Sequence, residues 1–406
     1  MSLLARWYSV FDIQALFSSL DRDLKLIFVA NLAGSFGDGL YAYIMPYYMK
    51  DSLKASAVEI GILYAMANLF ATMTLLIAGF LADRYDRKKI LVLGWAAWVP
   101  APLIFAVAQN WVQMIPGMAL WGVTLGPPAM AAFIIATTNK NKLTLTFTVI
   151  SSAWSLGYIF SPALGGYLGR TVGMPLVFLL SSIGYTAATV ILLLIKSQHC
   201  TNHTSDSERK EPSTLQLLKS RKLLALSVFL GAIMFALFLF RPFIPTFLTD
   251  VYGYNGFQIG VLGSFAFFGS ALLGIILGRL GDKTKKTRAL AAALAIIGFA
   301  LVPFLLFGDF QVLLVTQVLV GASYLAWPLM SAIIGPLAPE RARALWVAIP
   351  LAVGMFTAIL APYLGGVLYE ISPYYPFILG IALALLLALL ASAKPFDRLA
   401  ELLSKQ

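Results

Sequence analysis

The segment that decides the fold reads GFLADRYDRKK and occupies residues 79–89. It joins two long apolar runs, and it places Asp83 four positions after a glycine and just ahead of a basic cluster. A second copy, GRLGDKTKKTR, occupies residues 278–288, where Asp282 stands 199 positions after Asp83. Two such loops at a wide, fixed separation indicate that the chain is built from two similar halves.

Other pairs of segments repeat at nearly the same offset. EIGIL at residues 59–63 matches QIGVL at 258–262, again 199 positions apart. SPALGG at residues 161–166 matches APYLGG at 361–366, which is an offset of 200. A parallel repeat of this length, related by an axis along the membrane normal, is typical of solute transporters.

The composition places both halves in a membrane. Hydrophobic residues make up 60% of the 406 residues and charged residues only 12%, which is too little charge to cover a water-soluble domain. The apolar runs are continuous rather than alternating, so they indicate helices and exclude a β-barrel. We therefore predict an all-α membrane protein with twelve transmembrane helices in two pseudo-symmetric six-helix bundles. The expected spans lie near 24–49, 57–82, 88–108, 112–137, 144–168, 174–195, 223–249, 257–278, 288–307, 311–336, 343–368 and 374–393.

The domain organisation follows from these spans and from the distribution of charge. We expect an amphipathic cytoplasmic segment at 1–22, bundles at 23–195 and 223–395, a cytoplasmic linker at 196–222 and a tail at 396–406. Nearly all of the 29 Lys and Arg residues fall on the side of the termini and the linker. The positive-inside rule therefore predicts cytoplasmic termini in the plasma membrane, and it explains the net charge of +11 without nucleic acid.

Several classes of protein are excluded. The lone Cys200 cannot form an internal disulfide, and no residue cluster resembles a metal site. The sequence contains no nucleophile–base set and no phosphate-binding loop, so we expect neither an enzyme nor an ATP-driven pump, and no cofactor. The expected partners are the lipid bilayer, a small organic substrate and protons, with the protein acting as a monomer.

The two basic loops resemble the signature loop of the major facilitator superfamily. The resemblance implies a secondary transporter that alternates access between the two sides of the membrane, with these loops as part of its gate. The implied gating residues are Gly79, Asp83, Arg84, Arg87, Lys88, Gly278, Asp282 and Lys283.

Residues 157–166 look like the glycine-proline signature that proton-coupled antiporters of the family carry on their fifth span. Ser161 stands where that signature usually has Gly, and the fourth span lacks the Arg that many such antiporters place there. Small residues let membrane helices approach closely, and proline bends them. We expect helix packing at Gly157, Pro162, Gly165 and Gly166 and, in the second copy, at Pro362, Gly365 and Gly366.

Two ionisable residues fall well inside predicted spans. Asp38 lies in the first span and Arg241 in the seventh, and such residues are costly in lipid unless they serve a function or pair. In the repeat, Arg241 matches Ala42, one helical turn beyond Asp38 on the same face. The resemblance to the family implies that the first and seventh spans face each other across a central cavity, so we expect the two charges on its opposite walls. Asp38 is the predicted proton-coupling residue. Arg241 either binds an anionic substrate group, forms a structural ion pair or reaches toward the interface.

A set of polar and aromatic residues recurs at helical spacing in the predicted spans. We predict that the substrate cavity is lined by Asn31, Tyr41, Asn68, Trp121, Thr124, Arg241, Gln317, Tyr324 and Trp327. Each residue alone is as consistent with contacts between helices as with ligand binding. The set indicates an amphipathic cavity that suits a moderately hydrophobic organic solute better than a bare ion. Together with the resemblance to proton-coupled antiporters, this favours proton-coupled export of small amphipathic compounds. A sugar or organic-anion permease, working as symporter or uniporter, and a non-transporting receptor are the alternatives.

Overall fold

The computed structural model describes residues 20–138, 143–198, 221–334 and 343–393, and these form helices and loops without a strand. The N-terminal half contains α3 (Arg22–Ala42), α4 (Met45–Asp51), α5 (Ala57–Arg84), α6 (Arg87–Trp98), α7 (Pro100–Val107), α8 (Trp111–Trp121), α9 (Gly126–Thr137), α10 (Leu143–Thr171) and α11 (Met174–Leu193). The C-terminal half contains α13 (Arg221–Phe240), η2 (Arg241–Phe243), α14 (Ile244–Asp250), α15 (Gly256–Lys283), α16 (Lys286–Leu306), α17 (Phe310–Val320), η3 (Gly321–Leu325), α18 (Ala326–Ile334), α19 (Arg343–Ile371) and α20 (Tyr375–Ser392). The expected amphipathic segment and tail, and most of the linker, lie outside the described residues.

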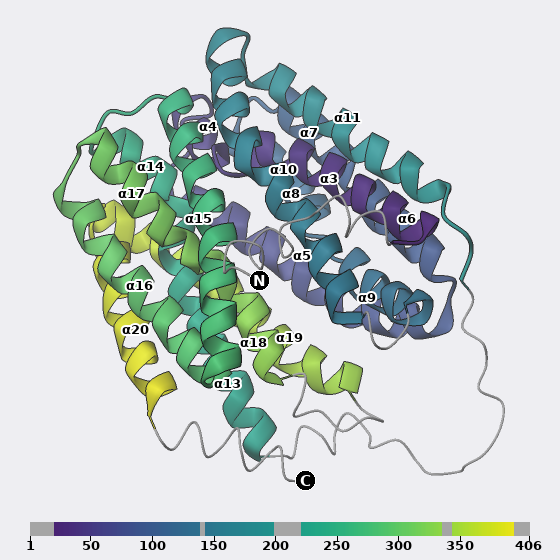
Figure 1. Cartoon of the computed structure of the whole chain (residues 1–406). Coiled ribbons are helices and arrows are strands. Elements are labelled where there is room, and N and C mark those ends of the chain that lie inside the picture. Colours follow the sequence, from purple (N-terminus) through teal and green to yellow (C-terminus); the bar gives the residue numbers. More distant parts are fainter. Residues whose placement is uncertain (1–19, 139–142, 199–220, 335–342, 394–406) are drawn as a thin grey trace, which may run out of the picture.

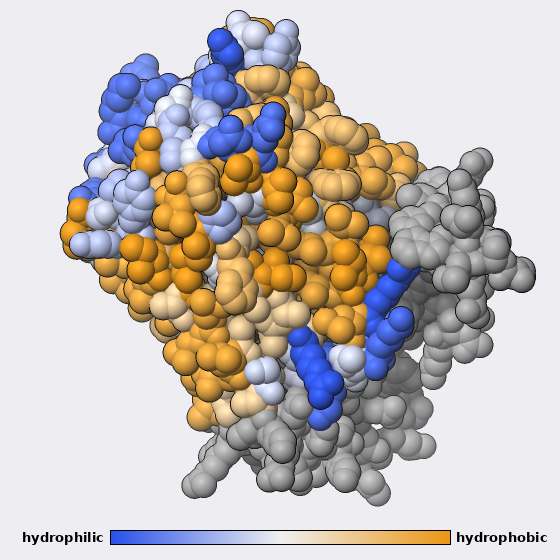
Figure 2. Space-filling model, turned by 60° about the vertical axis from the view of Figure 1, so that its left-hand side comes forward, coloured by the Kyte–Doolittle hydropathy of each residue, from blue (hydrophilic) through white to orange (hydrophobic). Residues whose placement is uncertain are grey.

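Ten segments of the described chain are long and apolar enough to cross a membrane. Two more, α3 with α4 and the long helix α10, pack alongside them and complete the twelve expected spans. Figure 2 shows apolar side chains over the middle of the visible face and hydrophilic ones toward its ends. This pattern is typical of a protein whose middle section lies in the hydrocarbon core of a membrane.

Several spans that the sequence predicted as continuous helices are interrupted. Helix α3 ends before Pro46, α13 gives way to η2 at Pro242, and α8 and α9 are separated before Pro127. Proline lacks the N–H that an α-helix requires and its ring collides with the preceding turn, so these breaks follow from the sequence. Non-helical backbone at membrane depth is tolerated only where protein or a polar cavity covers it.

The repeat is visible in the lengths and starts of the helices. Helices α5 and α15 have 28 residues each, and α10 and α19 have 29 each. Ser56 and Glu59 form a capping box at the start of α5, and Asn255 and Gln258 form the equivalent box at the start of α15. Reciprocal capping satisfies the first free N–H groups of a helix and fixes where it begins.

The halves meet at two equivalent crossings, α5 with α19 and α10 with α15 (Figure 1). A Cβ atom added to Gly61 would lie 2.3 Å from the carbonyl oxygen of Pro362, and one added to Gly260 would lie 2.2 Å from that of Pro162. These four residues are related by the repeat, so a pseudo-twofold axis relates the crossings. Backbone contact of this kind needs a residue without a side chain.

Within the N-terminal half, α10 packs on α3 through small residues. An added Cβ at Gly157 would lie 2.1 Å from the hydroxyl oxygen of Ser35, and one at Gly165 would lie 1.7 Å from the carbonyl oxygen of Leu40. Between them Ser161, which replaces the usual glycine, fits against Gly39. These contacts bring the helix that carries Asp38 directly against α10.

Candidate functional site

Asp38 is buried in the N-terminal half, with a side chain only 4% exposed. The indole nitrogen Nε1 of Trp121 donates a hydrogen bond to its Oδ1 at 2.8 Å. The hydroxyl groups of Tyr158 and Tyr185 donate to its two carboxyl oxygens, and the Tyr41 hydroxyl is 2.9 Å from that of Tyr185. Four side chains from α3, α8, α10 and α11 thus surround one carboxyl group.

Glycines beside Asp38 make this approach possible. An added Cβ on Gly37 would lie 2.9 Å from the carbonyl oxygen of Ser181 in α11, and one on Gly39 would lie 2.0 Å from the hydroxyl oxygen of Ser161 in α10. Removing a carboxylate from water without partners costs several kcal/mol or more, and hydrogen bonds to the charged form offset part of that cost. The tight packing of α10 and α11 therefore supplies the donors that a buried carboxylate needs.

Arg241 lies in the turn η2 between α13 and α14, and its side chain is half-buried. Its guanidinium carbon is 4.2 Å from the ring centre of Tyr324 and 5.3 Å from that of Phe238. No carboxylate of the described residues forms an ion pair with it. Asp38 is bound by partners of the N-terminal half and Arg241 by partners of the C-terminal half, so the structure does not show the alternative of a structural ion pair between them.

A row of aromatic rings connects these two sites across the boundary between the halves. The Tyr158 ring is 4.4 Å from the Phe267 ring, and Phe267 is 4.6 Å from Tyr324, measured between ring centres. The Tyr158 hydroxyl donates a hydrogen bond to Asp38, and the Tyr324 ring forms a cation–π contact with the guanidinium of Arg241. Tyr64 lies beside the first site, since its ring centre is 6.2 Å from that of Trp121.

Two predicted cavity residues form hydrogen bonds between the halves. Asn68 donates from Nδ2 to the carbonyl oxygen of Ala358 at 2.7 Å. Gln317 accepts a hydrogen bond from the Tyr43 hydroxyl at Oε1, at 3.1 Å, and its Nε2 has no partner among the described residues. Asn68 therefore acts in this conformation as a contact between helices.

The other predicted cavity residues are more dispersed. Asn31 donates to the sulfur of Met130 at 3.2 Å, inside the N-terminal half. Tyr41 is fully buried there, whereas Trp121, Thr124 and Trp327 are half-buried. The Thr124 hydroxyl is satisfied by the carbonyl oxygen of Gly122 at 2.9 Å.

The loop between α5 and α6 is held by a residue that the sequence did not single out. Asp86 accepts hydrogen bonds at Oδ1 from the backbone N–H of Lys88 and of Gln198, both at 3.0 Å. Arg87 donates from Nη1 to Oε1 of Gln198 at 3.1 Å. The basic loop is thus tied to the segment that follows α11.

The remaining predicted gating residues lie at the ends of α5 and α15. The surroundings of Gly79 and the side chains of Asp83 and Arg84 are outside the described part of the structure. Asp282 and Lys283 are exposed at the end of α15, and an atom added to Gly278 would meet nothing within 4 Å.

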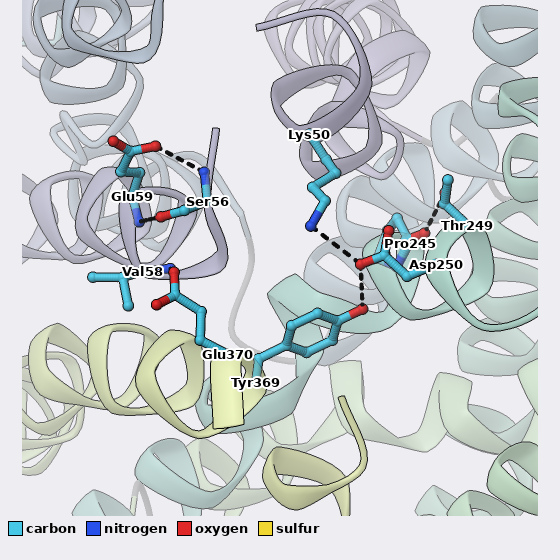
Figure 3. Close-up of polar contacts among 9 residues, drawn as sticks. All are labelled: Lys50, Ser56, Val58, Glu59, Pro245, Thr249, Asp250, Tyr369 and Glu370. Atoms are coloured by element: carbon cyan, nitrogen blue, oxygen red, sulfur yellow. Dashed lines mark hydrogen bonds and ion pairs between the residues drawn. The ribbon is translucent and has the colours of Figure 1, made fainter. Parts of the chain in front are cut away.

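The opposite end of the molecule is closed by polar contacts between the halves (Figure 3). Lys50 in α4 forms an ion pair with Asp250 in α14, with Nζ 3.3 Å from Oδ2. The Tyr369 hydroxyl donates to the same Oδ2 at 3.0 Å, and Glu370 accepts from the backbone N–H of Val58 at 3.2 Å. Gly61, at the crossing of α5 with α19, follows Val58 by three positions on α5.

Tyr158, Tyr185 and Phe267 are the site residues that sequence reasoning missed. Tyr158 lies inside the glycine-proline motif at 157–166, so its position beside a packing motif was a usable signal. Tyr185 and Phe267 are single aromatic residues in apolar spans, and nothing local distinguishes them from ordinary core residues.

Two pseudo-symmetric bundles of membrane helices are an architecture of secondary transporters. The chain belongs to the Major Facilitator Superfamily, whose family model matches residues 27–310 and 232–401. The predictions of this family and of its all-α, two-bundle membrane fold are confirmed.

Comparison with known proteins gives relatives in drug resistance. The chain is 26% identical to "Multidrug resistance protein 2" of Bacillus subtilis over 375 residues, which cover 88% of this chain and 92% of that protein. It is 22% identical to "Quinolone resistance protein NorA" of Staphylococcus aureus over 227 residues, covering 55% of this chain and 58% of NorA.

Solved structures share the fold at low sequence identity. A point mutant of the nucleoside transporter NupG superposes with a TM-score of 0.73 at 14% identity, covering 94% of this chain and 99% of that one. A bacterial homologue of the lysosomal transporter Spinster, inward-facing and occupied, gives 0.65 at 15% identity, covering 94% and 96%.

Proposed function

We propose that this transporter exports small amphipathic organic compounds from the cell in exchange for protons, with Asp38 as the coupling residue. The observation that carries the proposal is the enclosure of Asp38 by donors from three other helices. The two drug-resistance relatives support export as the direction. The protein then acts as a monomer in the plasma membrane, with the basic loops in the cytoplasm.

The coupling depends on a change in the surroundings of Asp38. Tyr158 touches the other half through Phe267, so a movement of the halves past one another disturbs one of the three donors. A carboxyl group whose donors differ between two conformations binds its proton with different affinity in each, which links proton binding to conformation. The conformation described here has the end near Lys50 and Asp250 closed, which in this topology is the outer end.

Asp38→Asn tests the proposal, because the amide keeps the size of the side chain and removes its titration. In proteoliposomes the variant should lose accumulation of substrate driven by a pH gradient, while downhill exchange stays measurable. Asp51→Asn, at an exposed position on α4, is the matched control and should keep both activities. Accumulation by Asp38→Asn against a substrate gradient would assign coupling to another residue.

The basic loops are proposed as part of the gate. Asp83→Asn should slow turnover more than it weakens substrate binding, because the loop lies at the end of α5, far from the central residues. Equal loss of binding and turnover would instead place Asp83 in the site or in folding.

An organic-anion or sugar permease is the second candidate. Arg241 favours it, since a cation with no carboxylate partner can receive an anionic group. Uptake that is insensitive to a pH gradient in the wild-type protein would favour this candidate over the antiporter.

A further inference from the structure

Arg241 is the one site charge for which the coupling mechanism gives no role. It stands in the C-terminal half, in a turn created by Pro242, with its guanidinium stacked on Tyr324 and near Phe238. Cation–π contacts leave the N–H donors at the edge of a guanidinium free, because the ring touches only its face. The described residues supply no carboxylate for that edge.

The surroundings of Arg241 provide aromatic rings and neutral polar groups, the Tyr324 hydroxyl among them, but no carboxylate of the described residues. The Tyr43 ring centre is 6.3 Å from that of Phe267, and the Tyr43 hydroxyl donates to Oε1 of Gln317, whose Nε2 is a buried donor without a partner among the described residues. Phe267 and Tyr324 present a pair of rings whose centres are 4.6 Å apart. A buried donor that lacks a partner is costly, so the free Nε2 of Gln317 points to an acceptor that arrives with a ligand.

We propose that Arg241 binds a carboxylate of the transported compound, and that the substrates are therefore aromatic organic anions rather than neutral or cationic compounds. The guanidinium would hold the carboxylate by two parallel hydrogen bonds, as its fork geometry permits. The aromatic part of the substrate packs on the rings of Tyr324 and Phe267. This inference rests on the proposed transport function and specifies its substrate class.

The two charged residues then have separate tasks. Asp38 and its donors lie in the N-terminal half and carry the proton, whereas Arg241 and its rings lie in the C-terminal half and carry the substrate anion. Because the two groups do not form an ion pair here, the anion does not have to displace Asp38 from Arg241 before it binds. Binding preference and pH-driven accumulation should therefore be separable by mutation.

The test uses two matched probes on the purified full-length protein, 1-naphthoate and its neutral amide 1-naphthamide. Their dissociation constants follow from the rise of the thermal transition with probe concentration at neutral pH. The wild type should bind the anion about tenfold or more tightly than the amide. In Arg241→Gln the two dissociation constants should be within about twofold of each other. Arg241→Lys keeps the charge but not the paired N–H donors of the guanidinium, so its preference for the anion should be intermediate between those of the wild type and Arg241→Gln. Arg170→Gln, at an exposed position at the end of α10, is the control and should keep the full preference.

The outcomes separate this inference from the proposed coupling. Equal binding of both probes by the wild type, or an unchanged preference in Arg241→Gln, would overturn the assignment of Arg241. Asp38→Asn should keep the preference for 1-naphthoate while it loses pH-driven accumulation. If Asp38→Asn keeps that accumulation, the coupling proposal fails while the preference for the anion still supports the role of Arg241.

Discussion

At the scale of single residues, Asp38 shows how a charge is kept inside a membrane bundle. Its carboxyl group takes donors from Trp121, Tyr158 and Tyr185, and these belong to three different helices. Each charge-assisted hydrogen bond is worth about 1.5–3 kcal/mol when its partner would otherwise stay buried and unpaired. Tyr158 is the donor in this group that also contacts the other half.

The link through Tyr158 gives a prediction about coupling. Tyr158→Phe keeps the ring on Phe267 and removes the hydroxyl, so pH-driven accumulation should fall about tenfold or more, in line with the loss of one such hydrogen bond. In the Asp38→Asn background, where downhill exchange is the remaining activity, the same substitution should cause no further loss of exchange. Tyr167→Phe, at an exposed position on the same helix, should leave accumulation unchanged. Additive losses in the double variant would show that Tyr158 does not act through Asp38.

At the scale of helices, the glycines of α5 and α15 decide how closely the halves approach. Gly61 and Gly260 face the carbonyl oxygens of Pro362 and Pro162, at distances that exclude any side chain. The two prolines also bend α19 and α10 beside these contacts. The closed end therefore depends on backbone-to-backbone contact at two related positions.

Adding a methyl group at one crossing should open that end. Gly260→Ala should increase the labelling of a cysteine at Ser264, a buried residue one turn further along α15, by a membrane-impermeant maleimide. The reporter requires Cys200→Ser, which removes the native thiol. Gly126→Ala is the control, because an added Cβ there meets nothing within 4 Å. Unchanged labelling in Gly260→Ala would mean that the helix crossing accommodates the added methyl group and that the closed end stays closed.

At the scale of the whole molecule, the closed end is held by contacts weak enough to break in each cycle. The side chains of Lys50 and Asp250 are 35% and 26% exposed. An ion pair with this much exposure contributes on the order of 1 kcal/mol or less. Opening the end thus requires little more than separating the two helix crossings.

Covalent linkage of this end should stop transport without stopping binding. In the Cys200→Ser background, Lys50→Cys with Asp250→Cys can be joined by a short bifunctional thiol reagent with a cleavable disulfide spacer. The linked protein should lose turnover, keep substrate binding and recover turnover after reduction. Each single cysteine variant treated in the same way is the control. Normal turnover of the linked protein would exclude opening at this end.

The orientation of the molecule can be tested with two exposed positions at opposite ends. Gln109→Cys, before α8, should react with an impermeant thiol reagent on intact cells, and Thr284→Cys, between α15 and α16, should react only with a permeant one. Both variants use the Cys200→Ser background. The reverse pattern would place the basic loops outside and would invert the proposed direction of closure.

The sequence by itself determined the class of fold and the repeat. Hydropathy, loop charge and matching motifs are local properties that can be counted along the chain, so the spans and the paired loops at 79–89 and 278–288 were predictable. The same reasoning singled out Asp38 and Arg241, because a charge inside an apolar run is conspicuous without any structure.

Only the tertiary structure decided which residues surround those charges. Tyr158 and Tyr185 reach Asp38 because Gly37 and Gly39 let α10 and α11 approach α3, and such contacts join residues more than 100 positions apart. Arg241 stacks on Tyr324 because both lie in turns where their spans are broken. No local pattern encodes contacts between distant segments, since these depend on how side chains of different helices fit together.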